Sequence, residues 1–224
     1  SFIMDAGSIS NNMTDSGYGG GVYVYDSDSG SGTFTMTGGI INNNTSSQGG
    51  GVYLEKVLKG SGSTFIMGGG SITQNTANYT GNGAGGGVYV AKGSSFTVSG
   101  DVQIKENKNN KNNAGEPNNV YLPTSYGDTV TITVADNLGE NAIIGVTMYT
   151  TLREGKPLTF ATAGEGCVLS DDDAARFTSD QGCYPYRMDG ENEVKMFVYR
   201  PQKHPICGKE CTHDEKHADL IWIG

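Results

Sequence analysis

The stretch Gly85-Gly86-Gly87-Val88-Tyr89-Val90 belongs to a motif that recurs through the first half of the chain and decides its fold. Related copies occupy residues 19–24 and 49–54, and a decayed copy occupies residues 118–122. A second motif, Phe-x-Met (Phe-x-Val in its last copy) followed by Gly, Ile and Asn, recurs in step. Its phenylalanines stand 32, 31 and 31 residues apart, at Phe2, Phe34, Phe65 and Phe96. Self-similarity at a fixed period of this size is the signature of a solenoid, in which each repeat forms one coil.

Each repeat contains three short apolar runs, which alternate with the period of two that is typical of strands. Gly, Asn, Ser and Thr, which favour turns, fill the gaps between the runs. The sequence therefore predicts an all-β fold, a right-handed parallel β-helix with three short strands in each coil of about 31 residues. Equivalent strands would stack about 4.8 Å apart. Intrinsic disorder is the alternative for such a composition, and the phased apolar residues argue against it.

The alternation of side chains along a strand predicts which of them face the core. We expect the valines and leucines of the Val-Tyr-Val runs to point inward, together with the Phe, Met, Val and Ile of the other runs. The expected core residues are Val22, Val24, Val52, Leu54, Val88, Val90, Val120, Leu122, Phe34, Met36, Ile41, Phe65, Met67, Ile72, Phe96, Val98 and Ile104. Asn12, Asn44, Asn75 and Asn107 share one repeat position after the inward Ile. Their amides are expected to form a ladder from coil to coil.

The chain divides into three parts. Residues 1–125 carry the regular repeats, residues 126–199 keep strand-like alternation without the repeat, and residues 200–224 form a Cys- and His-containing segment. We interpret the middle part as degenerate coils and a cap, because the terminal repeats of solenoids are usually atypical. A separate β-sandwich is the alternative, and residues 171–177 are expected to form one helical turn with an acidic start. Because the chain begins in mid-repeat, we expect it to be a fragment of a longer protein.

The net charge and the cysteine content indicate which partners and which cellular compartment suit the protein. A net charge of −9 and a pI near 4.7 argue against nucleic-acid binding, which needs a basic face. No apolar run is long enough to span a membrane, so we expect no membrane insertion. The composition fits a secreted or surface-displayed protein, which we expect to be monomeric. Cys167 and Cys183 could form a disulfide in an oxidising compartment or remain free thiols.

The Phe-x-Met-x-Gly-Gly-x-Ile-x-x-Asn and Gly-Gly-Gly-Val-Tyr-Val units resemble the β-helix repeats of large surface proteins of Gram-positive gut bacteria. They are also similar, more loosely, to the repeats of chlamydial polymorphic membrane proteins. The resemblance covers residues 1–125 and implies an extracellular, cell-wall-attached adhesin or binding protein. The partner that it implies is a host glycan or a host protein, immunoglobulins included. The resemblance carries over no catalytic residue.

The last part of the chain holds all of its histidines, beside two of its cysteines. Cys207, Cys211, His213 and His217 stand at short spacings that suit a tetrahedral zinc site, with His204 as a substitute ligand. A small disulfide between Cys207 and Cys211 is the alternative in an exported protein. A third interpretation is a linker or the start of another domain.

Parallel β-helices often carry polysaccharide lyases and hydrolases, so an enzyme fragment is the alternative function. A hydrolase needs two carboxylates that face each other across a groove. The carboxylates within the repeats share no repeat position, and we therefore expect no catalytic residues. A purely structural stalk is the remaining alternative.

The candidate ligand-binding surface is a stripe of tyrosines at the middle position of the Val-Tyr-Val runs. Tyr23, Tyr53, Tyr89 and Tyr121 share this position and are expected to point outward as an aromatic ladder. Tyrosine is favoured at binding surfaces because it combines a large contact area with a polar tip. The ladder could instead only stiffen the sheet through cross-strand stacking. The loops of variable length, 45–48, 55–63, 76–84 and 108–117, are the other candidate surface.

Overall fold

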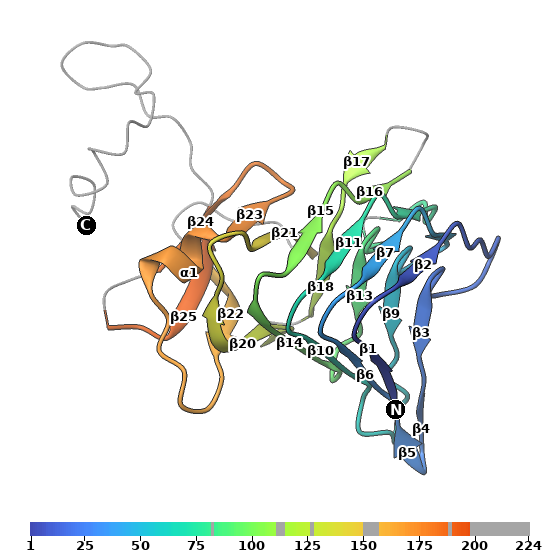
Figure 1. The fold of residues 1–224 in the computed structure, drawn as a ribbon, viewed down its shortest axis with the longest axis horizontal. Coiled ribbons are helices and arrows are strands. Elements are labelled where there is room, and N and C mark those ends of the chain that lie inside the picture. Colours follow the sequence, from blue (N-terminus) through green and yellow to red (C-terminus); the bar gives the residue numbers. More distant parts are fainter. Residues whose placement is uncertain (82, 111–114, 126–127, 150–156, 188–189, 198–224) are drawn as a thin grey trace.

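A computed structural model of the chain describes residues 1–81, 83–110, 115–125, 128–149, 157–187 and 190–197. It is an all-β solenoid of about five turns, each of about 32 residues. The coils lie side by side along one axis, from the N-terminal coil to a smaller C-terminal cap (Figure 1). The predicted parallel β-helix is therefore confirmed. Within the described residues the only α-helix is α1 (Asp171–Ala175).

One sheet collects the Phe-x-Met strands. Its regular strands are parallel and in register, so that Phe2 lies beside Phe34, Phe34 beside Phe65, and Phe65 beside Phe96. The strands, in spatial order, are β1 (Phe2–Met4), β6 (Thr33–Met36), β10 (Thr64–Met67), β14 (Ser95–Gly100), β20 (Ile132–Leu138), β22 (Leu158–Ala163), β25 (Glu193–Phe197) and β24 (Tyr184–Tyr186). The last two strands pair antiparallel and end the stack.

A second sheet contains both the Gly-x-Ile strands and the Val-Tyr-Val strands. In spatial order its strands are β2 (Ser8–Ser10), β7 (Ile40–Asn42), β11 (Ser71–Thr73), β15 (Gln103–Lys105), β21 (Ile143–Tyr149), β18 (Val120–Ser125), β13 (Val88–Val90), β9 (Val52–Leu54) and β3 (Val22–Val24). Two short strands pair at its margins, β19 (Asp128–Thr129) with β18 and β23 (Phe177–Ser179) with β21. The sequence predicted two separate stacks here, and β21 joins them.

Strand β21 explains how the two stacks become one sheet. Its residue Ile144 pairs with Ile104 of β15, and its residue Val146 pairs with Val120 of β18. One residue, Gly145, thus spans a step for which the fourth coil uses all the residues between Ile104 and Val120. Of these residues, the described ones from 107 to 110 and from 115 to 119 must leave the plane of the sheet. We call this projection, residues 12–21, 44–51, 75–81, 83–87, 107–110 and 115–119, the fin.

The fin has an outgoing wall and a returning wall. The outgoing wall is a small parallel sheet of β8 (Thr45–Ser46), β12 (Thr76–Ala77) and β16 (Lys108–Asn109), and β17 (Glu116–Pro117) pairs antiparallel with β16 at its edge. The sequence predicted loops here, not strands. The returning wall consists of the triple glycines, whose amides donate to the next coil, as Gly50 does to the carbonyl of Gly85. A hairpin of β4 (Asp26–Ser27) and β5 (Gly30–Ser31) follows β3 in the first coil and is not part of the fin.

The two walls pack backbone to backbone, which explains the triple glycines. A Cβ atom added to Gly50 would lie 2.5 Å from the carbonyl oxygens of both Gly86 and Thr76. No side chain fits at this distance, because the neighbouring atoms belong to paired backbone. The Gly-Gly-Gly motif is therefore a steric requirement of the fin.

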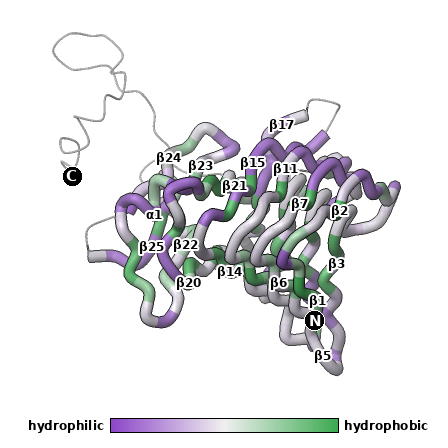
Figure 2. The backbone as a smooth tube through the Cα atoms, in the orientation of Figure 1, coloured by the Kyte–Doolittle hydropathy of each residue, from purple (hydrophilic) through white to green (hydrophobic). Residues whose placement is uncertain are grey.

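The core lies between the two main sheets. All the expected core residues are buried except Val22, which lies in the open first coil and is partly exposed. The rings of Phe34 and Phe65 stack with centroids 4.7 Å apart, and those of Phe65 and Phe96 with centroids 5.0 Å apart. Figure 2 shows the hydrophobic positions along β1, β6 and β14, and a hydrophilic band along the ends of β2, β7, β11 and β15.

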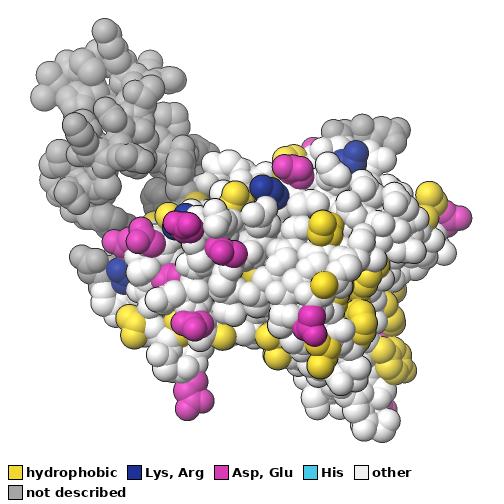
Figure 3. All heavy atoms as spheres, in the orientation of Figure 1, with side chains coloured by type: hydrophobic (Ala, Val, Ile, Leu, Met, Phe, Trp, Pro, Cys, Tyr) yellow, Lys and Arg dark blue, Asp and Glu magenta, His cyan; other side chains and the backbone are white. Residues whose placement is uncertain are grey.

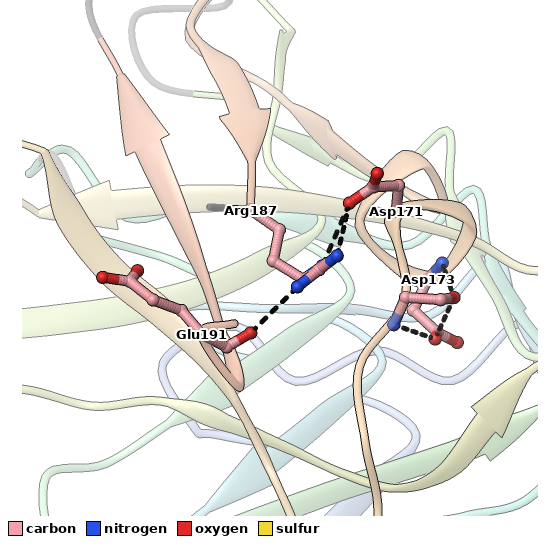
Figure 4. Close-up of polar contacts among 5 residues, drawn as sticks. Asp171, Asp173, Arg187 and Glu191 are labelled. Atoms are coloured by element: carbon pink, nitrogen blue, oxygen red, sulfur yellow. Dashed lines mark hydrogen bonds and ion pairs between the residues drawn. The ribbon is translucent and has the colours of Figure 1, made fainter. Parts of the chain in front are cut away.

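The C-terminal coils continue the sheets and carry the cap. Ser170 caps the N-terminus of α1, and its hydroxyl accepts from the amide of Asp173. The predicted acidic start is present, but the helix ends at Ala175, and Phe177 begins β23. The buried carboxylate of Asp173 accepts from the amides of Ser170 and Leu138, and so ties the helix to β20. Arg187, after β24, donates to the carboxylate of Asp171 and to the carbonyl of Glu191 (Figure 4). Cys167 and Cys183 are free thiols that pack against the core, not a disulfide.

Candidate functional site: the tyrosine face and the corner groove

The four predicted tyrosines form one continuous stack on the Val-Tyr-Val strands. Tyr23 lies in register with Tyr53, Tyr53 with Tyr89, and Tyr89 with Tyr121. The ring centroids of successive pairs are 5.6, 4.8 and 5.3 Å apart, with interplanar angles between 14° and 27°. Each inner ring is therefore covered on its flat faces by its neighbours. The stack offers ring edges and hydroxyl groups to its surroundings.

Tyr121 is buried, unlike the other three tyrosines. The prediction of a fully exposed ladder is therefore wrong at this position. Only 4% of its surface is accessible. Its hydroxyl lies so close to the fin that a Cβ atom added to Gly83 would approach it to 2.2 Å. The loop that carries Gly83 is an insertion in the third coil, and its fold over the next coil could not be foreseen from the repeat.

Three further tyrosines, which the repeat did not reveal, flank the stack. Tyr18 stacks on Tyr53 with the ring centroids 4.7 Å apart, and Tyr25 lies tilted against Tyr23. Tyr79 lies close enough to Tyr89 to affect its ionisation. Tyr18, Tyr25 and Tyr79 are 49%, 60% and 41% exposed. We call the set Tyr18, Tyr23, Tyr25, Tyr53, Tyr79 and Tyr89 the tyrosine face.

Three hydroxyls of the tyrosine face, those of Tyr23, Tyr53 and Tyr89, have a raised pKa. Burial raises the pKa of Tyr23 well above the usual range, and a hydrogen bond to Glu55 adds to the effect. Burial also raises the pKa of Tyr53 and of Tyr89, in both cases assisted by neighbouring tyrosines. These three hydroxyls therefore act as neutral hydrogen-bond donors and acceptors.

A loop next to the tyrosine face, residues 55–63, is held by a buried carboxylate. Asp26 is completely buried and accepts from the hydroxyl of Ser31 and from the amide of Val57. Hydrogen bonding to Ser31 is the main cause that lowers its pKa. Asp26 is thus a structural residue that holds this loop in place. At the tip of the loop, Leu58 is fully exposed.

A second surface feature is a polar groove at the corner where the outgoing wall of the fin leaves β7, β11 and β15. It has a volume of about 330 Å³ and is lined by Asn43, Thr45, Gln74, Thr76, Glu106 and Lys108. We call it the corner groove. The variable loops predicted as the other candidate surface include Thr45, Thr76 and Lys108. Asn43, Gln74 and Glu106 were not predicted, because they resemble ordinary turn residues.

The predicted asparagine ladder is present and continues beyond the repeats. The Oδ1 atom of Asn75 accepts from both the backbone amide and the Nδ2 atom of Asn44, and the same pattern joins Asn12 to Asn44 and Asn75 to Asn107. Asn119 is the fifth member, because its Oδ1 accepts from the amide and Nδ2 of Asn107. Asp180 ends the ladder by accepting from the amide and Nδ2 of Asn119.

The carboxylate of Asp180 makes the stability of the ladder depend on pH. Burial raises the pKa of Asp180 above its usual value, although Asn119 and Thr147 donate hydrogen bonds to it. A raised pKa in the folded state means that protonation of Asp180 favours folding. This stabilisation is complete below the unfolded pKa and is lost as the pH rises through the folded pKa.

We therefore expect the free energy of unfolding, taken relative to an Asp180→Asn variant, to increase as the pH falls from 7 to 4. Asparagine can accept through one Oδ1, as every other rung does, so the variant should fold. Urea titrations of both proteins at several pH values measure the difference. The same comparison for Asp28→Asn, at the exposed hairpin tip, reports the effect of removing a surface carboxyl. A difference that shrinks toward low pH would contradict the assignment.

The predicted zinc ligands Cys207, Cys211, His213 and His217 lie outside the described residues, as does the proposed Cys207–Cys211 disulfide. In the part of the chain that the structure describes, no three His, Cys, Asp or Glu side chains are grouped so that they could hold a metal ion. The helix search over the same part found none with the length and apolarity that crossing a membrane requires.

The surface of Figure 3 separates charged from uncharged regions. The charged side chains visible there gather mainly over the C-terminal coils and cap, while the surface over the regular coils is largely uncharged. Comparison with known proteins adds no assignment to these surfaces. No family model, no curated protein and no solved structure matches the chain.

Proposed function

We propose that the chain is a non-enzymatic, ligand-binding segment of an extracellular surface protein, an adhesin that holds a host protein on its tyrosine face. The observation that supports this best is the concentration of six accessible or half-buried tyrosines on one side of a rigid stack. Aromatic residues, tyrosine among them, are enriched at protein interfaces and supply large contact areas at low entropic cost.

The geometry favours a protein partner over a glycan at this face. A sugar ring binds tyrosine through the flat face of the aromatic ring, and the stack covers those faces on Tyr53 and Tyr89. Exposed edges and neutral hydroxyls suit the backbone carbonyls and amides of a protein surface. The fully exposed Leu58 on the neighbouring loop adds an apolar contact.

The enzyme alternative receives less support from the geometry. A glycoside hydrolase needs a pair of carboxylates across a groove, and the corner groove carries one carboxylate, Glu106. The carboxylate of Asp26 is buried and committed to hydrogen bonds within its own loop.

Binding of polyclonal immunoglobulin G and of secretory immunoglobulin A, measured by biolayer interferometry, tests the proposal. We expect Tyr25→Ala combined with Tyr79→Ala to weaken the complex by about tenfold or more, as the loss of interface hot spots does. The control, Thr35→Ala with Thr97→Ala, changes the outer face of the other sheet and should leave binding unchanged. If neither immunoglobulin binds, or if both double variants bind equally well, the proposal is wrong and a structural stalk is favoured.

A further inference from the structure

We propose that the corner groove binds a neutral, unbranched oligosaccharide whose chain runs along the solenoid axis, one sugar unit per coil. The inference is independent of the tyrosine face, because the fin separates the two surfaces. The outgoing wall carries the groove, while the tyrosines follow the returning wall. It rests on the shape of the groove, on its free polar groups and on an unusual choice of residues in its turns.

The lining of the groove repeats from coil to coil. Each of three coils contributes two side chains: Asn43 and Thr45, then Gln74 and Thr76, then Glu106 and Lys108. Thr45 lies in register with Thr76, and Thr76 with Lys108. Coils are spaced by the usual distance between strands, about 4.8 Å, which is close to the length of one sugar unit in an extended chain. A volume of about 330 Å³ lies at the lower end of the usual range for small-ligand sites, about 300–1,000 Å³.

The polar groups of the groove are not used by the protein itself. Within the described residues, none of the six lining side chains forms a hydrogen bond or an ion pair. Two amides, two hydroxyls, one carboxylate and one ammonium group therefore remain available to a ligand. The opposite charges of Glu106 and Lys108 cancel, so the groove as a whole favours a ligand without net charge.

Three turn residues of the groove have a left-handed backbone conformation that is unfavourable for their residue types. Asn43, Gln74 and Glu106 adopt φ values of 55°, 58° and 59°. Apart from these and Asn11 at the same repeat position, every described residue with positive φ is a glycine. Left-handed backbone is unfavourable for residues that carry a Cβ, and more so for Gln and Glu than for Asn. Strain of this kind is typical of functional positions, where the side chain is needed.

An extended peptide fits the groove less well than a glycan. Peptides usually add a strand to an open sheet edge or insert apolar side chains into pockets. Here β8, β12 and β16 are stacked and β16 is closed by β17, and the lining of the groove contains no apolar residue. A polyol that forms hydrogen bonds with amides and hydroxyls matches this lining.

Calorimetric or NMR titration with chitotriose, cellotriose and xylotriose tests the inference, with a Gly-Ser hexapeptide as the probe for the other class. We expect at least one trisaccharide to bind. The pair Gln74→Gly and Glu106→Gly should weaken it by about tenfold, since each lost hydrogen bond contributes modestly. The same pair should raise Tm by about 2 °C or more, because glycine relieves the left-handed turns.

The matched control is Asn11→Gly, which changes the same turn in the first coil but lies outside the groove. It should leave binding unchanged. The pair Tyr25→Ala and Tyr79→Ala should also leave trisaccharide binding unchanged, which separates this site from the tyrosine face. The inference is overturned if no trisaccharide binds, if only the peptide binds, or if the glycine pair binds the sugar as tightly as the parent protein.

Discussion

Asn75→Leu is expected to lower the free energy of unfolding by about 4 kcal/mol, because several buried polar groups lose a partner at a cost of about 1–3 kcal/mol each. Asn75 is completely buried. It accepts from the amide and Nδ2 of Asn44, and it donates to the Oδ1 of Asn107 and to the carbonyl of Ile41. Leucine has the same number of side-chain heavy atoms and a similar branched shape but a larger volume, so overpacking adds to the loss of hydrogen bonds.

Urea unfolding followed by circular dichroism measures the effect of Asn75→Leu. The control is Asn42→Leu, at a half-exposed position of β7 in the neighbouring coil, which should change stability by no more than about 0.5 kcal/mol. Equal stabilities of the two variants would show that the ladder does not hold the coils together.

Gly50→Ala is the second large effect, with an expected loss of about 3 kcal/mol or more through overpacking. The new methyl group would lie 2.5 Å from two carbonyl oxygens, and both belong to backbone that is hydrogen bonded to the adjoining coils. The Thr76 backbone of the outgoing wall and the Gly86 carbonyl of the next coil would both have to move away, and the shift of Gly86 would weaken its hydrogen bond from the amide of Gly51.

Gly68→Ala provides the matched control for the fin. A Cβ atom at Gly68 would meet only the hydroxyl of Ser99, at an ordinary 3.6 Å. Alanine there should leave stability unchanged or raise it by up to about 1 kcal/mol, because it restricts the unfolded chain. Thermal and urea unfolding of both variants test the assignment, and a Gly50→Ala protein as stable as Gly68→Ala would refute the close packing of the walls.

The repeat carried enough information to predict the stacked strands, the core and the first four rungs of the ladder. Each of these follows from a side chain that returns at a fixed spacing, so that Phe34 and Phe65 meet in register. Because side chains alternate between the two faces of a strand, Tyr53 and Tyr89 lie on the outer surface when their neighbours face the core.

Contacts outside the repeat could not be predicted in this way. Asn119 and Asp180 join the ladder although neither stands at its spacing, because β21 bypasses the fin and brings a distant loop to the ladder's end. The burial of Tyr121 depends on how one insertion folds over the next coil. A signal for the corner groove was present in the sequence: Gln74 and Glu106 occupy a turn position at which the first two coils have Asn11 and Asn43, which tolerate left-handed backbone better.

Oxidative cross-linking of paired cysteine substitutions tests the stacking of like residues most directly. Thr35 and Ile66 are register partners on adjacent strands, and Thr97 lies one coil further along. In-register neighbours are about 4.8 Å apart, within the Cα–Cα range of about 4.4–6.8 Å that a disulfide requires. The solenoid predicts that T35C/I66C forms a disulfide, identified by peptide mass mapping, and that T35C/T97C forms none. Cross-linking of T35C/T97C without cross-linking of T35C/I66C would contradict the parallel, in-register stack.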